Sequence, residues 1–270
     1  MAAAPARRRR RARIGGRLGR PAYLATAVAT FVVLIAAWWA ASASGLVDPM
    51  FLPGPDQVLS ALGRQAGNGE LWADIGVSSF RILIGFLLAT VMAIPLGTLM
   101  GVSAVAEAAL EPLMDFIRYM PVVAFVPLTI VWVGIDESQK FLIIWMGTFF
   151  QQVLMVADAV RRTPRNLVSL GETLGLGRIQ LLTRIVVPSA MPRIWDALRI
   201  TLGWAWTWLV VAELVAASSG MGFRITVAQR FFETELIIGY VLVLGVLGLI
   251  LDQAMRAGGR RMFAYQEGRS

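Results

Sequence analysis

Long apolar runs separated by short polar connections make up most of the chain. A helix crosses the membrane with about 20 apolar residues, because it rises ~1.5 Å per residue through ~30 Å of hydrocarbon. Each run is apolar all round, without the alternation of barrel strands, so helices are predicted. The pattern therefore predicts an all-α polytopic membrane protein with six transmembrane helices. The six runs are Ala22–Ala43, Val77–Gly101, Leu110–Val133, Phe141–Val160, Ile194–Ala217 and Leu236–Met255.

The second run carries a small residue at every fourth position: Gly85, Ala89, Ala93, Gly97 and Gly101. This spacing places them on one helix face, where they let a neighbouring backbone approach closely. We therefore predict a helix-packing seam, with a seam that slides during transport as the alternative.

Prolines interrupt two of the runs. Pro95 is expected to bend the second run, and Pro121 and Pro127 are expected to bend the third. Proline lacks the backbone N–H of a helix interior and clashes with the preceding turn, so it commonly causes a kink.

Composition agrees with a lipid environment and excludes much chemistry. Hydrophobic residues make up 57% of the chain and charged residues 16%, against ~25% charged in soluble domains. The sequence contains no cysteine and no histidine, which removes thiol nucleophiles, imidazole bases and their metal sites. The single lysine, Lys140, follows Gln139 rather than glycine, so the Gly-Lys-Ser/Thr of a phosphate-binding loop is absent. We predict no catalytic, metal or cofactor site and no ATP site in this chain.

Basic residues predict the orientation. Eighteen of the 25 Lys and Arg residues lie in residues 1–21, the segment 161–193 and the tail after Met255. With six spans these regions share one side, which the positive-inside rule makes cytoplasmic, together with both termini. We predict a basic cytoplasmic arm over 1–21, a transmembrane domain over 22–256 and a cytoplasmic tail over 257–270. The arm is expected to meet anionic lipid rather than nucleic acid, and the first run is too long for a typical signal peptide.

Few polar side chains lie within the predicted spans. Asp115 and Arg118 are three residues apart and can form a pair on one helix face. Glu213 lies near the outer end of the fifth run, where a carboxylate is most often solvated; the alternative places it on a permeation path or outer gate. Polar groups at depth are expected to face protein or a water-filled cavity. The residues predicted for a translocation path are Gln151, Gln152, Trp204, Thr207 and Glu213.

The segment 161–193 reads as two short amphipathic helices. Thr163 and Pro164 can open the first helix, with threonine as its cap. Leucines at 167, 170 and 174 follow at helical spacing, and Gly175 and Gly177 are expected to end it. A second stretch, 179–187, is expected to stop at Pro188 and Pro192. Such an element suits either docking in a partner's groove or resting on lipid headgroups.

This segment resembles the EAA loop of permease subunits of ABC importers. Gly175 is followed after nine residues by Ile185, Val186, Val187 and Pro188, which is similar to the family's Gly, nine residues, Ile-x-Leu-Pro. The Glu-Ala-Ala positions fall on Ser169, Leu170 and Gly171, and the nearest glutamate is Glu172. The resemblance implies a coupling helix that contacts an ATPase through Leu167, Ser169, Leu170, Gly171, Glu172, Leu174, Gly175 and Pro188.

Further segments are similar to the nitrate/sulfonate/taurine branch of these permeases and extend the resemblance over about Met50 to Met255. They are Phe51–Val58, Ile94–Gly97, Arg118–Pro121, Pro127–Gly134 and Gly147–Phe150. Their order and spacing make the resemblance specific, although each is short.

The resemblance implies an inner-membrane subunit of a prokaryotic ABC importer for a small, anionic solute such as nitrate, bicarbonate, a sulfonate or taurine. The implied partners are a second permease copy in a homodimer, two ATP-binding subunits that hold ATP and Mg, and an extracytoplasmic solute-binding protein. Membrane lipid is an expected partner and nucleic acid is not. The alternative from the residues is an ion-coupled secondary transporter that uses Glu213.

Overall fold

The computed structural model describes residues 19–45 and 47–264. The predicted basic arm therefore lies almost entirely outside the described residues. The chain divides into two compact units, Met1–Gln57 and Val58–Ser270. The first unit contains α1 (Arg20–Ala43), with a proline in its first turn. After α1 the chain turns back, and the Trp38 Nε1 donates a hydrogen bond to the Pro53 carbonyl at 3.0 Å.

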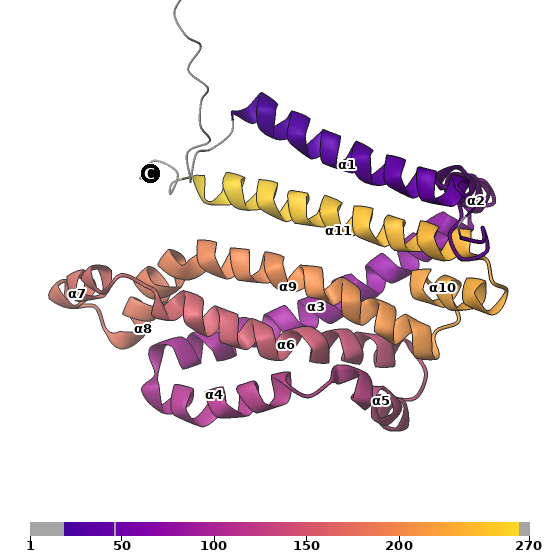
Figure 1. Ribbon diagram of the computed structural model, residues 1–270. Coiled ribbons are helices and arrows are strands. Elements are labelled where there is room, and N and C mark those ends of the chain that lie inside the picture. The colour runs from indigo at the N-terminus through magenta and orange to yellow at the C-terminus, as the bar shows by residue number, and fades with distance from the viewer. Residues whose placement is uncertain (1–18, 46, 265–270) are drawn as a thin grey trace, which may run out of the picture. The chain divides into compact units, whose positions relative to one another are not determined.

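The second unit is built from helices throughout its described residues (Figure 1). Helix α2 (Pro55–Gly67) leads into it. The long helices are α3 (Glu70–Val102), α6 (Glu137–Arg161), α9 (Val187–Ala216) and α11 (Thr234–Met262). The shorter ones are α4 (Ala104–Arg118), the 3₁₀ turn η1 (Val122–Phe125), α5 (Val126–Val133), α7 (Arg165–Thr173), α8 (Arg178–Leu181), the π turn η2 (Leu182–Val186) and α10 (Met221–Arg230).

Five described helices, including α1, are long and apolar enough to cross a membrane, and a bent helix pair makes a possible sixth span. These spans confirm the predicted all-α membrane fold. The largest group of buried apolar side chains includes residues of α3, α6, α9 and α11, among them Ile82, Ile194 and Tyr240. Many other large apolar side chains on these helices are exposed, as expected where lipid replaces water.

The third predicted span is a broken helix. Helix α4 ends at Arg118, and the chain resumes as η1 and α5 at an angle of 84° to it. Pro121 supplies no N–H and restricts Met120, so the helix ends before it. The predicted bend at Pro121 is confirmed. Pro127 sits in the first turn of α5, where proline is tolerated, so the bend predicted there is wrong. Helix α3 continues through Pro95.

The small-residue seam of α3 packs against α6. A Cβ atom built on Gly97 would lie 2.6 Å from the Val153 carbonyl oxygen, and one on Gly85 would lie 2.7 Å from the Ile144 Cβ. Ala89 and Ala93 on the same face are fully buried. The predicted packing seam is therefore confirmed, with α6 as the partner helix.

The prolines after α8 do not stop the chain's helical path. Helix α9 begins directly after η2. Pro188 lies in its first turn, and Pro192 lies inside it. The predicted stop at these prolines is wrong. A π turn widens the hydrogen-bonding ring, and the first turn of a helix does not need the proline N–H. The chain from Arg178 to Val215 is consequently one continuous helical segment of 38 residues.

Candidate functional site

Helix α7 and its glycine turn form the first candidate site. Pro164 occupies the N-cap position without a side-chain cap, so the predicted threonine cap is wrong. Gly175 has φ of +75°, the left-handed conformation that favours glycine. Around it the Leu176 N–H donates to the Gly171 carbonyl at 3.1 Å, and the Gly175 N–H donates to the Glu172 backbone carbonyl at 2.9 Å. This pattern satisfies the last carbonyls of the helix and confirms the predicted end at Gly175.

The two faces of α7 differ. Gly171 is buried, and a Cβ atom there would lie 2.4 Å from the Ile185 Cδ1, so the missing side chain lets α7 lie directly on η2. Leu170 and Leu174 are 57% and 70% exposed, and Ile179 on α8 is 78% exposed. Figure 1 shows α7 and α8 beyond the ends of α6 and α9. The other predicted residues divide in the same way: Ser169, Glu172, Gly175 and Pro188 are exposed and Leu167 is half-buried.

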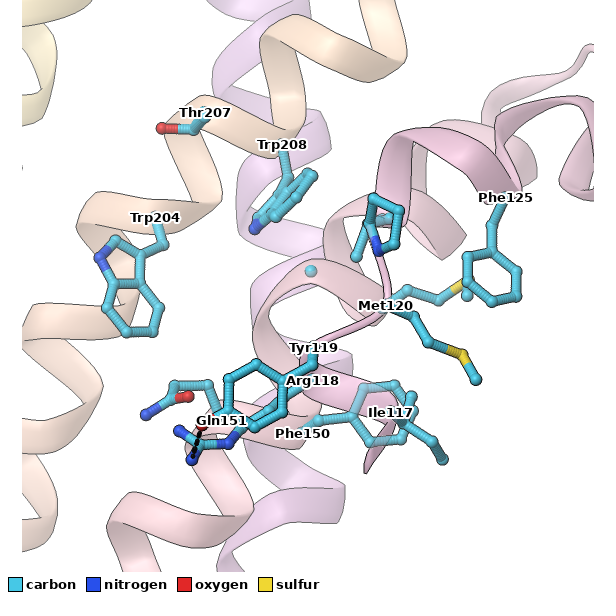
Figure 2. Close-up of a pocket in the computed structure, with 14 residues that line it drawn as sticks. Ile117, Arg118, Tyr119, Met120, Phe125, Phe150, Gln151, Trp204, Thr207 and Trp208 are labelled. Atoms are coloured by element: carbon cyan, nitrogen blue, oxygen red, sulfur yellow. Dashed lines mark hydrogen bonds between the residues drawn. The ribbon is translucent and has the colours of Figure 1, made fainter. Parts of the chain in front are cut away.

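A cavity of about 510 Å³ forms the second candidate site. Its walls come from the end of α4, the break before α5, the middle of α6 and the middle of α9 (Figure 2). Three predicted path residues line it: Gln151, Trp204 and Thr207. Gln152 is buried beside it at 1% exposure, and no described residue makes a hydrogen bond to its side-chain amide. Glu213 does not line the cavity.

Arg118 is the only charged side chain among the described residues that line this cavity. Its Nε lies 2.9 Å from the Asp115 carboxylate, which confirms the predicted pair. Its Nη2 donates to the Tyr119 hydroxyl at 3.1 Å (Figure 2), and its guanidinium carbon lies 4.7 Å from the Tyr119 ring centroid. The guanidinium is held on two sides.

Glu213 belongs to a buried ionic cluster. Its side chain is 0% exposed and pairs with the Arg81 Nη1 at 2.8 Å. The Ser78 hydroxyl donates to the same carboxylate at 2.8 Å, and the Gly222 N–H donates at 2.7 Å. The prediction of a solvated carboxylate is therefore wrong. Helix α3 brings a guanidinium against α9, and a buried charge needs such a partner.

The cluster extends to other helices. Arg81 also binds Glu137 at the start of α6, with Nε to carboxylate oxygen at 2.7 Å. Asp74 accepts hydrogen bonds from the Tyr240 hydroxyl at 2.9 Å and from Arg224 on α10 at 3.0 Å. Burial opposes the charge of Arg224, but the Asp74 hydrogen bond and the nearby charges of Asp74 and Glu70 together outweigh burial, so the pKa of Arg224 is raised. Ion pairs and hydrogen bonds thus join α3, α6, α9, α10 and α11 at one end.

Sequence reasoning did not identify Arg81 or Asp74. Arg81 lies inside the second apolar run, and an arginine there requires a partner of opposite charge. That requirement was the available signal, and Glu213 was the matching acid 132 residues away.

The long apolar helices define a polytopic helical membrane protein. Residues 82–264 match the family described as the binding-protein-dependent transport system inner membrane component. The chain belongs to this family.

Relatives agree with this assignment. A probable ABC transporter permease protein of Brucella abortus (strain 2308) is 38% identical over 88% of this chain and 94% of its own length. The taurine transport system permease protein TauC of Escherichia coli (strain K12) is 33% identical over 87% of each chain. A solved structure of the MetNI methionine ABC transporter superposes with a TM-score of 0.59 at 19% identity, over 69% of this chain and 95% of the other.

The chain is a permease subunit of an ABC importer, as the loop motif predicted. Relatives named for taurine, aliphatic sulfonates and nitrate also confirm the predicted branch. The ion-coupled alternative loses its proposed acid, because the Glu213 carboxylate is enclosed by Arg81, Ser78 and Gly222.

Proposed function

We propose that this permease works as a homodimer that encloses a path for a small anionic solute. Two ATP-binding subunits hold ATP and Mg on the cytoplasmic side, and an extracytoplasmic binding protein delivers the solute. The family description and the relatives named for taurine, sulfonates and nitrate support this proposal. Both termini are cytoplasmic, and the arm (1–21), transmembrane domain (22–256) and tail (257–270) are its parts.

Helix α7 with its glycine turn is the coupling element in this proposal. The observation that supports it best is the exposure of Leu170, Leu174 and Ile179 on an element that extends beyond the long helices. Exposed apolar residues on a short helix are typical of helix-in-groove binding. Glu172 is exposed on the same helix and can present its carboxylate in place of the missing glutamate at Ser169.

The cavity is part of the path in this proposal. Gln151, Trp204 and Thr207 face it, whereas Gln152 and Glu213 act behind it as packing and ionic support. The middle positions of α6 and α9 that line it support an intramembrane location.

Substitution of Gly175 by valine tests the coupling assignment. Valine is strongly disfavoured at φ of +75°, so the turn after α7 must change shape. We expect an intact complex whose ATPase is no longer stimulated by loaded binding protein and whose solute uptake is abolished. ATPase activity and uptake are measured in proteoliposomes that contain the whole transporter.

The matched control is Gly177→Val. Gly177 has φ of −68° and ψ of 163°, which valine adopts readily, and no atom lies within 4 Å of a Cβ built there. We expect this control to retain stimulation. Equal, wild-type stimulation in both variants would contradict the assignment of α7.

A further inference from the structure

We propose that the cavity beside the α4–α5 break binds the oxyanion group of a small organic anion, and that Arg118 is the residue that receives it. The inference rests on the proposed function, since it takes the cavity to be part of the transport path. The ligand class is a sulfonate or carboxylate on a short organic body, rather than a bare inorganic anion such as nitrate.

The depth of Arg118 carries the first step. The cavity residues of α6 run from Met146 to Gln151, which is the middle of Glu137–Arg161. Arg118 is the last residue of α4 and lines the same cavity, so it lies level with the middle of a spanning helix. A charged side chain at this depth is costly and marks a substrate pathway when it faces a cavity.

The contacts of the guanidinium carry the second step. The Asp115 carboxylate pairs with the Arg118 Nε, and the Tyr119 hydroxyl accepts a hydrogen bond from the Arg118 Nη2. No described residue forms a hydrogen bond or ion pair with Nη1. Asp115 does not line the cavity, so it anchors the Arg118 guanidinium from outside the cavity. The remaining N–H groups of the guanidinium can donate hydrogen bonds to an anion inside it. Planar guanidinium groups held in this way bind oxyanions through paired hydrogen bonds.

The rest of the lining indicates an organic body. Five aromatic residues line the cavity, together with the polar side chains of Gln151 and Thr207. Figure 2 draws Trp204, Thr207 and Trp208 on one helix, and Arg118 and Tyr119 where another helix ends. The volume of about 510 Å³ falls in the range of ~300–1,000 Å³ typical of organic ligand pockets. The aromatic lining residues are Tyr119, Phe125, Phe150, Trp204 and Trp208.

Fluorescence titration of the full-length permease, assembled with its ATP-binding subunits in nanodiscs, tests the site. The probes are butanesulfonate, the neutral butanesulfonamide and nitrate. We expect butanesulfonate to change tryptophan emission saturably, and Trp204→Phe to reduce that change. Arg118→Gln should weaken binding by roughly tenfold or more, because it removes a charge-assisted hydrogen bond. The affinity of Arg118→Lys for butanesulfonate should lie between those of the wild type and Arg118→Gln.

Arg260→Gln is the matched control, since Arg260 is exposed near the end of α11 and does not line this cavity. It should bind butanesulfonate like the wild type. The inference is overturned if wild type shows no saturable change, if Arg118→Gln binds as tightly as wild type, or if butanesulfonamide or nitrate binds as tightly as butanesulfonate. Binding in this titration does not depend on coupling between the ATPase and the permease. The Gly175→Val experiment can therefore contradict the α7 assignment while the titration supports the anion site, and the reverse.

Discussion

Glu213 and Arg81 illustrate how one residue's role depends on its neighbours. In the sequence, Glu213 is a carboxylate near the end of an apolar run. In the structure it is fully buried and its partner Arg81 is 1% exposed. Such a pair is no guarantee of net stability, because desolvation offsets the attraction, but the loss of one partner leaves an uncompensated buried charge.

Glu213→Gln is therefore expected to destabilise the permease. It removes one of the two carboxylates that pair with Arg81, which keeps Glu137 and the Ser219 carbonyl as partners. Loss of a hydrogen bond to a charged group costs about 1.5–3 kcal/mol, which is measured as a lower melting temperature of the purified protein. Glu233→Gln, at an exposed position before α11, should change stability by about 0.5 kcal/mol or less. Equal melting temperatures for the two variants would show that the cluster does not hold α9 to α3.

Glycine has different uses at different positions of this chain. Gly175 supplies a backbone conformation, whereas Gly147 supplies space: a Cβ atom there would lie 2.2 Å from the Trp208 ring. The ring of Trp208 therefore rests directly on α6 at the wall of the cavity. The amphipathic pattern before Gly175 predicts its turn, whereas no local spacing marks Gly147, because its contact comes from Trp208 on α9.

The α3–α6 contact shows how elements, rather than residues, set the packing. Small residues repeat every four positions on α3, and α6 places Val153 and Val156 against them. Without a hydrophobic driving force between helices in lipid, close backbone approach and van der Waals contact hold such a pair together.

Gly97→Ala is predicted to push the two helices apart. Its Cβ would lie 2.6 Å from the Val153 carbonyl oxygen and 2.7 Å from the Val156 Cβ, and neither atom is the flexible end of a side chain. Overpacking of this kind costs about 1–3 kcal/mol. Gly76→Ala in the same helix meets no atom within 4 Å, so it should be neutral or slightly stabilising. Thermal unfolding of both variants compares them directly, and a similar loss in both would refute the seam.

Charge is distributed unevenly along the molecule. The end with α7 and α8 carries Arg161, Arg162, Arg165, Arg178 and Arg184. The opposite ends of α3, α9 and α11 hold the ionic cluster, whose arginines are matched by acids. Arg161 and Arg162 pair with acids, whereas Arg165, Arg178 and Arg184 form no ion pair with a described residue. An excess of basic residues favours the cytoplasmic side, which supports the proposed orientation.

Cysteine labelling tests that orientation, because the chain contains no cysteine of its own. Leu174 and Phe231 are 70% and 71% exposed at opposite ends of the helices. We expect an impermeant maleimide to label Phe231→Cys in intact cells and to label Leu174→Cys only after permeabilisation. The reverse pattern would invert the topology and place α7 away from any cytoplasmic ATPase.

The membrane class, the apolar spans, the α3 seam and the glycine turn after α7 could be predicted from the sequence. Each depends on local spacing: length of an apolar run, small residues four apart, or a glycine after a short amphipathic helix. The limits also have local causes. The prolines at 121, 127 and 188 look alike in sequence, but one ends a helix and two sit in first turns.

Only the tertiary structure decided which distant residues meet. It joined Arg81 to Glu213 and Asp74 to Arg224 across 132 and 150 residues of chain. It also broke the third span at the level where Arg118 meets the middle of α6, and so placed a guanidinium in a cavity. The local sequence pattern determines which helices and turns each segment can form. Which side chains of distant segments meet depends on how the helices pack in the folded chain.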